Sequence, residues 1–521
     1  MFVCMDSDAS RSGHIWALVA VCAVLFLTFL DTTIVSVALA SVQATLHAGV
    51  TQLQWVVNGY ALSFASLMMI AGSLSDRLGR KRVMLTGLVI FAAGSLLGAL
   101  APSPAILIVA RVVMGIGAAA SEPGTLSVIR HLYPAPEDRA RALGAWAAVS
   151  GLALALGPVI GGVLVGISDW RAVFWFNVAA AGVIVALAAV MIPESRDQQS
   201  ARLDLPGFVT GAAGLGALTF AVILGETNGY RSSVVIVLFV IGVVGLVGFT
   251  RVEHHSRAPM LDLSYFRSAP FTGSLIVAFV LFFGIFSIFF FTALYLSAVV
   301  GYSPDRIALE FAPMTVAMIT AAGLAGARVA LRGPRLTMAE GCVLAGAGIL
   351  LSEVLLDAPQ PSLWLMATLA LAGFGFGTSV VPVTSVSLGA VPPERSGMAA
   401  SATNTSRELG AVFGVAVLGA LVNAHLTTDL TRRLQALKIP ANFISVVIAA
   451  IETGSVPPGV HAVGADASIE NKVIVAAYGA FRSGLQIALV ASGLALLAAA
   501  LVAATTLRAG NGHEVAGQQS L

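Results

Sequence analysis

The sequence has few charged residues and few cysteines. Asp, Glu, Lys and Arg make up 10% of its 521 residues, whereas a water-soluble protein carries about a quarter. The three cysteines, Cys4, Cys22 and Cys342, show neither a disulfide framework nor metal-ligand spacing. The sequence also lacks a P-loop, a nucleophile elbow and a clustered histidine pattern. We therefore expect no enzymatic chemistry, no metal or other cofactor, and no nucleotide or nucleic-acid partner.

Long apolar runs dominate the rest of the chain. Hydrophobic residues make up 58% of the sequence, and the mean hydropathy is +0.92. Fourteen segments are each long enough to cross a hydrocarbon core of ~30 Å. They lie near residues 15–40, 52–72, 82–101, 104–130, 141–166, 171–192, 204–225, 233–251, 270–299, 305–329, 335–356, 362–390, 397–424 and 474–507. The sequence thus predicts an all-α, polytopic membrane protein with fourteen transmembrane helices.

The positions of Arg and Lys predict the orientation of these helices. If both ends of the chain lie on one side, the connections on that side hold eighteen Arg or Lys residues. The short connections on the other side hold only Arg171, Arg231 and Arg306. Because cationic loops stay in the cytoplasm, we expect both termini to be cytoplasmic and the protein to span the plasma membrane. The long connection 425–473 is basic, but long loops translocate largely regardless of charge.

Fourteen helices are most simply divided into six, two and six, because many transporters consist of two similar six-helix bundles. The helices near 204–251 have few polar residues, as expected of an insertion that faces lipid. This division gives a cytoplasmic segment 1–14, an N-terminal bundle 15–200, an insertion 201–268, a C-terminal bundle 269–507 with outer loop 425–473, and a tail 508–521.

Two oppositely charged residues are predicted at similar depths in the membrane. Asp31 lies about nine residues from the outer end of the first helix, and Arg111 about seven residues from the outer end of the fourth. At ~1.5 Å per residue their depths are comparable, so they can pair if the helices are neighbours. Ionisable residues inside a membrane are usually functional, although a structural ion pair that locks helices together is the alternative.

The fourth helix carries a second candidate charge. Glu122 follows Arg111 by eleven positions, or about three turns, so Arg111, Gly115, Ala118 and Glu122 share one face. An acid, a base and small residues between them predict the wall of a cavity. Pro123 removes a backbone donor and is expected to bend the helix. The alternative for Glu122 is again a structural ion pair.

Asp31 and Glu122 are therefore the candidate proton carriers, with Arg111 as a coupling partner. A cavity acid held near a cation can exchange a proton when water reaches it from alternate sides of the membrane. Four residues of the second helix are candidates for ligand contact, with interhelical hydrogen bonding and aromatic anchoring as the alternative. They are Gln54, Trp55, Asn58 and Tyr60. Farther along the chain, Arg407 and Glu408 point about 100° apart and favour a structural or gating role.

The segment 72–81, Gly-Ser-Leu-Ser-Asp-Arg-Leu-Gly-Arg-Lys, resembles the loop between helices two and three of the major facilitator superfamily. The alternative is a simple topology signal, but a loop held in the cytoplasm does not need this spacing of Gly and Asp. Three further segments resemble the fourteen-helix drug:proton antiporters of that family. They are Leu-Asp-Thr-Thr-Ile-Val at 30–35, Arg111 to Gly117, and Gly-Pro-Val-Ile-Gly-Gly at 157–162. Trp170, Arg171, Phe174, Phe176 and Asn177 are similar to the signature that follows in the sixth helix.

This resemblance covers residues 15 to about 425 and implies secondary active export, in which a proton enters and a hydrophobic compound leaves. Asp76 and Arg80 would form a cytoplasmic latch, and Arg111 would be the proton-relay partner. Gly157 and Pro158 would bend the antiport helix, and Asn177 would be structural or gating. The full latch motif comprises Gly72, Asp76, Arg77, Gly79 and Arg80, and the antiport motif Gly157, Pro158, Gly161 and Gly162.

Five positions depart from the family pattern. Ser36 and Ala40 replace the usual Asn and Pro, and Met114 replaces Gln. Asn58 stands where some exporters of cationic drugs have an acid, which argues against dicationic substrates. Glu122 stands where an apolar residue is more common.

The favoured function is proton-coupled export of hydrophobic or amphipathic small molecules by a monomer, with the small molecule, protons and membrane lipid as partners. One alternative is a proton-coupled transporter of an endogenous lipid or metabolite, including an importing symporter, against which the segment 157–162 argues. The other is a polytopic membrane protein without transport activity. The sequence does not give the substrate or the number of protons.

Overall fold

The computed structural model describes residues 3–195, 205–256, 261–356, 363–392, 396–439 and 469–506. Within these ranges the secondary structure is helical, as predicted, and contains no strand. The first helices are α1 (Val3–Leu46), α2 (Val50–Leu78), α3 (Arg80–Ala99), α4 (Pro104–Ser121), α5 (Pro123–Leu132), α6 (Pro136–Ile167) and α7 (Arg171–Met191). The others are α8 (Leu205–Asn228), α9 (Ser233–His255), η1 (Leu263–Arg267), α10 (Ala269–Ser287), η2 (Ile288–Thr292), α11 (Ala293–Ala298), α12 (Pro304–Leu355), α13 (Leu363–Gly389), α14 (Ser396–Ala436) and α16 (Ile469–Thr506).

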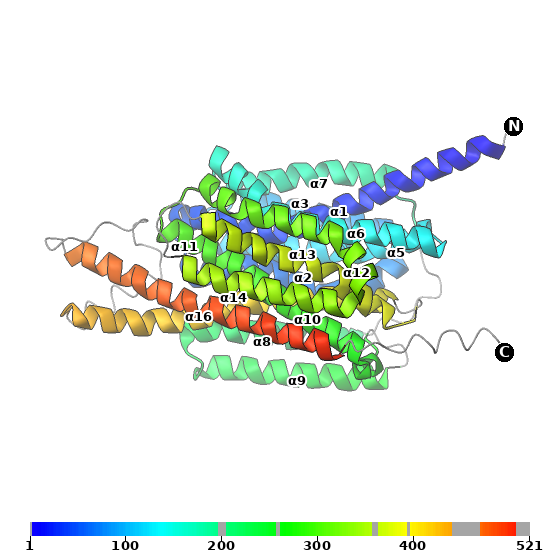
Figure 1. Cartoon of the computed structure of the whole chain (residues 1–521). Helices are drawn as coiled ribbons and strands as arrows, with labels where there is room; N and C mark the ends of the chain where they lie inside the picture. Colours follow the sequence, from blue (N-terminus) through cyan, green and yellow to red (C-terminus); the bar gives the residue numbers. More distant parts are fainter. Residues whose placement is uncertain are drawn as a thin grey trace.

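These helices form one bundle with roughly parallel axes (Figure 1). In the part of the chain that the structure describes, eleven helices are long and apolar enough to cross a membrane. The chain is therefore a multi-pass membrane protein. The beginning of α1 and the end of α16 lie at the same end of the bundle. We call this the terminal end.

Helix α12 is too long to be straight. It runs for 52 residues, but its backbone leaves helical geometry at Gly333, where φ is 77°. A Cβ added at Gly373 of α13 would overlap the carbonyl of Met314, and one at Gly348 would overlap the amide of Ala372. In a straight helix Met314 and Gly348 would be about 50 Å apart. Since both contact the same turn of α13, α12 folds back on itself at Gly333, between the two segments predicted near 305–329 and 335–356.

Two predicted segments need comment. The span predicted near 104–130 is one membrane-crossing segment, Pro104–Ile129, interrupted between the end of α4 at Ser121 and the start of α5 at Pro123, whose ring removes a backbone donor. The outer loop predicted at 425–473 begins and ends within helices, since α14 extends to Ala436 and α16 begins at Ile469. An ion pair of 2.8 Å between Arg433 and Asp429, one turn apart, supports this extension of α14.

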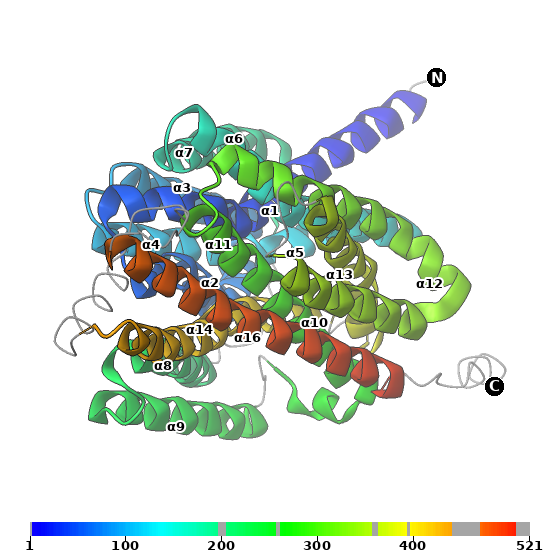
Figure 2. The same cartoon turned by 60° about the vertical axis from the view of Figure 1, so that its left-hand side comes forward.

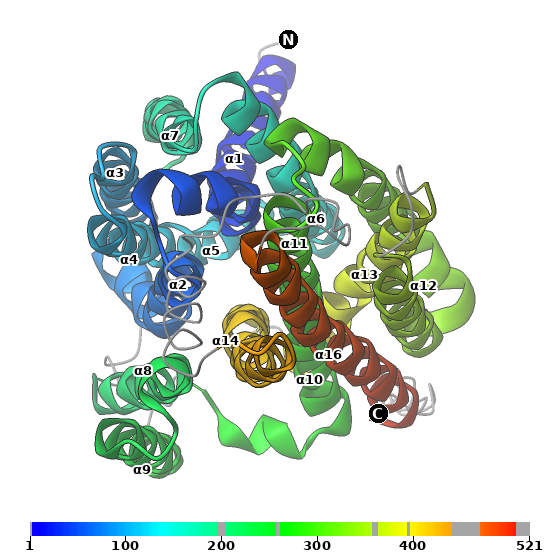
Figure 3. The same cartoon turned by 90° about the vertical axis from the view of Figure 1, so that its left-hand side faces the viewer.

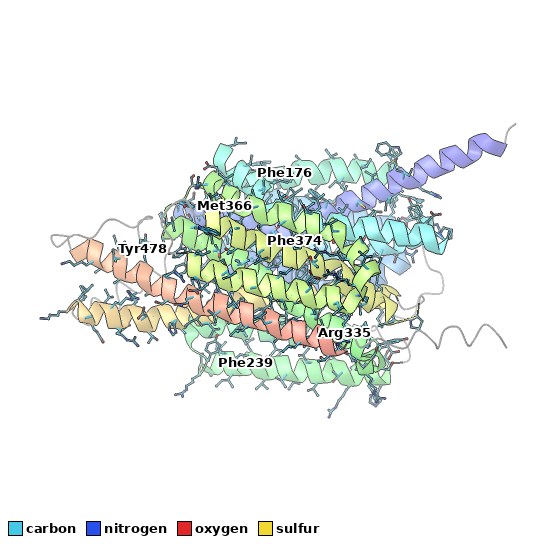
Figure 4. The ribbon with its side chains drawn as sticks, viewed as in Figure 1. Phe176, Phe239, Arg335, Met366, Phe374 and Tyr478 are labelled. Atoms are coloured by element: carbon cyan, nitrogen blue, oxygen red, sulfur yellow. The ribbon has the colours of Figure 1, made fainter. Side chains whose placement is uncertain are left out.

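Helices α8 and α9 lie together at one edge of the bundle, beside α2 and α14 (Figures 2 and 3). Figure 4 labels Phe239 on α9 at this edge. The exposed side chains of α9 are largely apolar, as the sequence predicted for helices that face lipid. They include Val234, Ile236, Val237, Val240, Ile241, Val243, Val244 and Val247.

Candidate functional site

A buried ion pair joins α1 to α4. Arg111 donates through Nη1 to Oδ2 of Asp31, and both side chains are almost completely buried. Arg111 Nε also donates to the carbonyl of Val56, at 2.9 Å, and Asn177 Nδ2 donates to the other oxygen of Asp31, at 2.6 Å. The structure therefore brings together the two charges whose depths were predicted to match. It adds Asn177, from α7, as a second hydrogen-bond donor to the acid.

Tyr60 covers this ion pair from α2. The Arg111 guanidinium lies 4.4 Å from the centre of the Tyr60 ring, a cation–π distance. The Tyr60 hydroxyl donates to the carbonyl of Thr28, at 2.9 Å, and so connects α2 to α1. Four helices thus surround one carboxylate that has no contact with bulk solvent. Such a group exchanges a proton only if the packing around it changes.

A second buried polar cluster joins helices that are distant in the sequence. Asn404 of α14 donates through Nδ2 to Oε1 of Glu122, at 2.9 Å, and both side chains are buried. Arg407 donates to Oδ1 of Asn404, at 3.3 Å, and to the carbonyl of Val380 in α13, at 3.4 Å. Glu408 is also buried. Glu122 therefore lies at a contact between α14 and the junction of α4 and α5.

The oxygens of this cluster are not all paired. Among the described residues, Oε2 of Glu122 and Oε2 of Glu408 have no hydrogen-bond donor. A buried acceptor without a donor costs about 1–3 kcal/mol, and more if it is charged. Burying this cluster therefore costs less free energy when either Glu122 or Glu408 is protonated.

The four candidate ligand residues of α2 separate in the structure. Gln54 and Asn58 are one turn apart and both buried, and neither amide atom of Asn58 has a partner among the described residues. Trp55 instead contacts Phe220 of α8, with ring centres 5.2 Å apart. Tyr60 belongs to the ion-pair cluster. Only the Gln54 and Asn58 positions present a buried polar face of the kind that was expected.

The small residues of α4 pack against helices. A Cβ added at Gly115 would overlap Ser63 Oγ and the carbonyl of Tyr60 in α2, and Ala118 is completely buried. Gly115 therefore packs closely against α2, and a cavity lined by Gly115 and Ala118 stays a prediction. The same small side chains that would leave room for a ligand also let two helices approach closely.

The connection between α2 and α3 is fixed to the end of α7. Gly79 has a φ of +112°, and Glu194 Oε1 accepts from the backbone amide of Lys81, at 3.2 Å. The amide of Arg80 donates to the carbonyl of Ser195, at 3.1 Å. A Cβ added at Gly72 would lie 3.5 Å from Pro123 Cβ, an ordinary van der Waals distance. The side chains of Asp76 and Arg77, the other latch residues, are outside the described residues.

Gly79→Ala is expected to destabilise this connection. The positive φ of Gly79 strains the backbone of any residue that has a Cβ. The new Cβ would also lie 2.6 Å from Glu194 Oε1. We expect a loss of about 1–3 kcal/mol and a lower unfolding temperature in detergent. Gly182→Ala is the control, because no atom lies within 4 Å of its added Cβ. Equal unfolding temperatures for the two variants would contradict the anchoring role of this glycine.

Glycines also bring α6 against α1. A Cβ at Gly157 would overlap Thr33 Oγ1, and one at Gly161 would lie 2.5 Å from the carbonyl of Ile34. Thr33 Oγ1 donates to the carbonyl of Leu154, at 2.9 Å. Pro158 lies inside α6, and Gly162 is buried beside Gly161. This close packing involves Thr33 and Ile34, which lie two and three residues from Asp31 in the sequence.

Comparison with known protein families identifies the group to which the chain belongs. The profile of the Major Facilitator Superfamily matches residues 21–415. The chain belongs to the Major Facilitator Superfamily. Members of this superfamily are transporters of small molecules rather than enzymes, and the family prediction from the sequence motifs is confirmed.

Relatives within the superfamily carry names of resistance and efflux proteins. The chain is 33% identical over 437 residues to the multidrug resistance protein Stp of Mycobacterium tuberculosis, covering 84% of this chain and 81% of the relative. It is 34% identical to the puromycin resistance protein pur8 of Streptomyces alboniger, covering 80% and 82%. It is 29% identical to the tetracenomycin C resistance and export protein of Streptomyces glaucescens, covering 95% and 92%. These relatives support the drug-efflux branch of the superfamily.

Solved structures show the same fold. A bacterial homologue of the human lysosomal transporter Spinster, in an inward-facing and unoccupied conformation, matches with a TM-score of 0.60 and 18% identity, covering 95% of this chain and 97% of that one. The xylose transporter XylE from E. coli matches with a TM-score of 0.55 and 14% identity, covering 78% and 92%. This likeness concerns the superfamily fold alone.

Two contributors to the site were not predicted from the sequence. Asn404 was not among the residues predicted for the site, although its amide is the partner of Glu122. Glu194 follows α7 in a short polar segment and gave no signal beyond its charge. Both interactions join segments that are far apart in the sequence, so no local spacing indicates them.

Proposed function

We propose that the protein is a proton-coupled antiporter that exports hydrophobic or amphipathic small molecules, such as drugs, antibiotics or toxic metabolites. The main support is the fully buried carboxylate of Asp31, held by Arg111 and Asn177 inside a transporter fold. A charge inside a membrane is expensive and usually serves transport. Each proton that enters across 100 mV releases ~2.3 kcal/mol, enough for a roughly fifty-fold concentration ratio of an uncharged substrate.

In this proposal the chain crosses the plasma membrane fourteen times and has both ends in the cytoplasm. Eleven described helices qualify by length and hydropathy, and α12 folds back at Gly333 to supply a further crossing. Helices α2 and α8 supply the remaining two. The excess of Arg and Lys at the terminal end supports the orientation. The proposed functional unit is a monomer of two six-helix bundles, with α8 and α9 inserted between them.

The test is an accumulation assay in cells that lack or overproduce the protein. The panel contains puromycin, methylenomycin A and tetracenomycin C, because these compounds occur in the names of relatives. We expect overproduction to lower the accumulation of at least one lipophilic compound, and an uncoupler to abolish the difference. Export that persists after the gradient collapses would refute proton coupling. If the cells instead export an endogenous lipid or metabolite, the protein is a transporter of that substrate class rather than of drugs.

Glu122→Gln tests the role of the second acid. Glutamine keeps an oxygen that accepts from Asn404, so the contact with α14 is retained while the titratable group is lost. We expect gradient-driven export to fall at least ten-fold, or its pH optimum to move by at least one unit. Glu340→Gln is the control, because this acid pairs with Arg328 and Arg332 near the surface. If export and its pH profile remain unchanged, Glu122 is structural.

A further inference from the structure

An apolar cavity of about 420 Å³ lies between the inserted helices and the rest of the bundle. Its walls are parts of α2, α8, α9, α10 and α14, together with the segment around η1. The beginnings of α8, α10 and α14 and the last turns of α9 contribute, so the cavity lies in the terminal half of the bundle. It is separate from the Asp31–Arg111 pair, and none of the candidate ligand residues of α2 lines it.

The lining is suited to an uncharged ligand. None of the described side chains that line the cavity is ionisable, and four phenyl rings contribute, those of Phe208, Phe249, Phe266 and Phe279. A charged group would be desolvated here without a counter-ion, which is very costly. The volume is within the ~300–1,000 Å³ range of cavities that hold drug-sized molecules.

The wall contains a buried hydroxyl that is available to a ligand. Ser406 Oγ donates to the carbonyl of Leu275, at 2.8 Å, and Thr272 Oγ1 donates to the carbonyl of Phe266, at 2.7 Å. Thr405 Oγ1 is buried and has no partner among the described residues. A threonine hydroxyl within a helix often donates to the carbonyl one turn earlier. The hydroxyl of Thr405 does not, so it is free to donate to a molecule in the cavity. A ligand with one hydrogen-bond acceptor would satisfy it.

Helix α14 separates the cavity from the buried polar cluster. Ala402, Thr405, Ser406 and Leu409 line the cavity and follow the i, i+3, i+4, i+7 spacing of one helix face. Asn404, Arg407 and Glu408 have the i, i+3, i+4 spacing of the opposite face, where Asn404 contacts Glu122. At ~100° per residue the centres of these two faces are about 160° apart. A ligand in the cavity would therefore press on the helix that holds Glu122.

We infer that this cavity is a binding site for a neutral, lipophilic small molecule that carries one hydrogen-bond acceptor. The inserted helices α8 and α9 form its outer wall, which gives these helices a role in ligand binding. Its role in transport rests on the proposed export function, whereas its ligand chemistry rests on the lining alone. The occupant would reach α14 from the membrane, where such a compound concentrates.

The test uses benzophenone, a neutral and photoreactive diaryl ketone whose carbonyl can accept from Thr405. The purified full-length protein is irradiated with benzophenone in detergent, without an ion gradient, and adducts are mapped by mass spectrometry. We expect adducts on the cavity faces of α8, α10 and α14. Ala212→Phe fills the cavity and should reduce them at least five-fold. Ala213→Phe is the control, because this neighbouring residue is exposed.

A second variant covers the case in which Ala212→Phe unfolds. Thr405→Val removes the free hydroxyl but keeps the shape of the side chain. It should raise the benzophenone concentration for half-maximal labelling about three- to ten-fold. Competition by diphenylmethane, which has the two rings but no carbonyl, should be unchanged.

Three results would overturn the inference. Adducts that are equally frequent on the exposed face of α9 would indicate simple partitioning. Cavity adducts that neither Ala212→Phe nor Thr405→Val changes would show that the ligand lies elsewhere. Cavity adducts that disappear in phospholipid nanodiscs would mean that a lipid acyl chain fills the space. Specific labelling combined with absent export in cells would instead refute the proposed function and leave the site intact.

Discussion

Asp31→Asn is expected to abolish gradient-driven export while leaving the protein in the membrane. Asparagine retains the size of the side chain and one acceptor oxygen, but it cannot carry a titratable proton. It also leaves the Arg111 guanidinium buried without its counter-ion. Breaking a buried pair from one side costs about 3–5 kcal/mol, so we also expect a lower unfolding temperature. Proton-driven uptake into inverted vesicles measures the first effect, and thermal unfolding in detergent the second.

A double variant separates coupling from stability. Replacing both partners, Asp31→Asn with Arg111→Gln, removes the unpaired charge and should recover much of the lost stability. It should not recover export, because no titratable group returns. Glu340→Gln again serves as the control for loss of an acid. Undiminished transport by the Asp31→Asn variant in energised vesicles would refute the coupling role of this acid.

Gly157→Ala is expected to reduce export strongly through packing alone. The new methyl group would overlap Thr33 Oγ1 and lie 2.9 Å from the amide of Ile34. Helices α1 and α6 must then separate, and overpacking of this kind costs about 1–3 kcal/mol. Because Thr33 is two residues from Asp31, the separation also displaces the coupling acid. We expect at least a ten-fold loss of export and a lower unfolding temperature.

Gly151→Ala is the matched control on the same helix. An added Cβ at this position has no atom within 4 Å. Alanine is favoured over glycine inside a helix by about 1 kcal/mol, so this variant should be as stable as the parent or more so. Adding Thr33→Ala to Gly157→Ala removes the overlapping hydroxyl and should restore part of the stability. Equal export by the two glycine variants would show that contact between α1 and α6 is not required.

The sequence predicted the elements that depend on local composition and depth. The lengths of the apolar segments predicted the helices. The Gly-Pro at 333–334 falls in the connection predicted between two membrane segments. Counting residues from the helix ends placed Asp31 and Arg111 at one depth, and they pair because α1 and α4 are neighbours in the fold. Depth along a helix can be counted from a sequence because the rise per residue is constant.

The sequence could not predict which helix faces meet. Glu122 has its partner 282 positions later, in Asn404, and no periodicity connects them. Gly115 fits both a cavity wall and a close helix contact, and the structure has the contact. Trp55 was expected near a ligand or at the interface, but it packs on Phe220 because α8 lies beside α2. These outcomes depend on how helices are arranged around each other, which composition does not encode.

The two polar clusters differ in what would happen during a cycle of alternating access. Asp31, Arg111 and Asn177 all belong to helices before the insertion, so rigid rocking of one bundle against the other leaves their contacts intact. The bond between Asn404 and Glu122 joins helices on opposite sides of the insertion, and the same rocking would stretch it. The distance between two spin labels beside this bond would therefore change with the conformational state of the carrier. The distance between labels beside Asp31 and Asn177 would stay constant and serve as an internal reference.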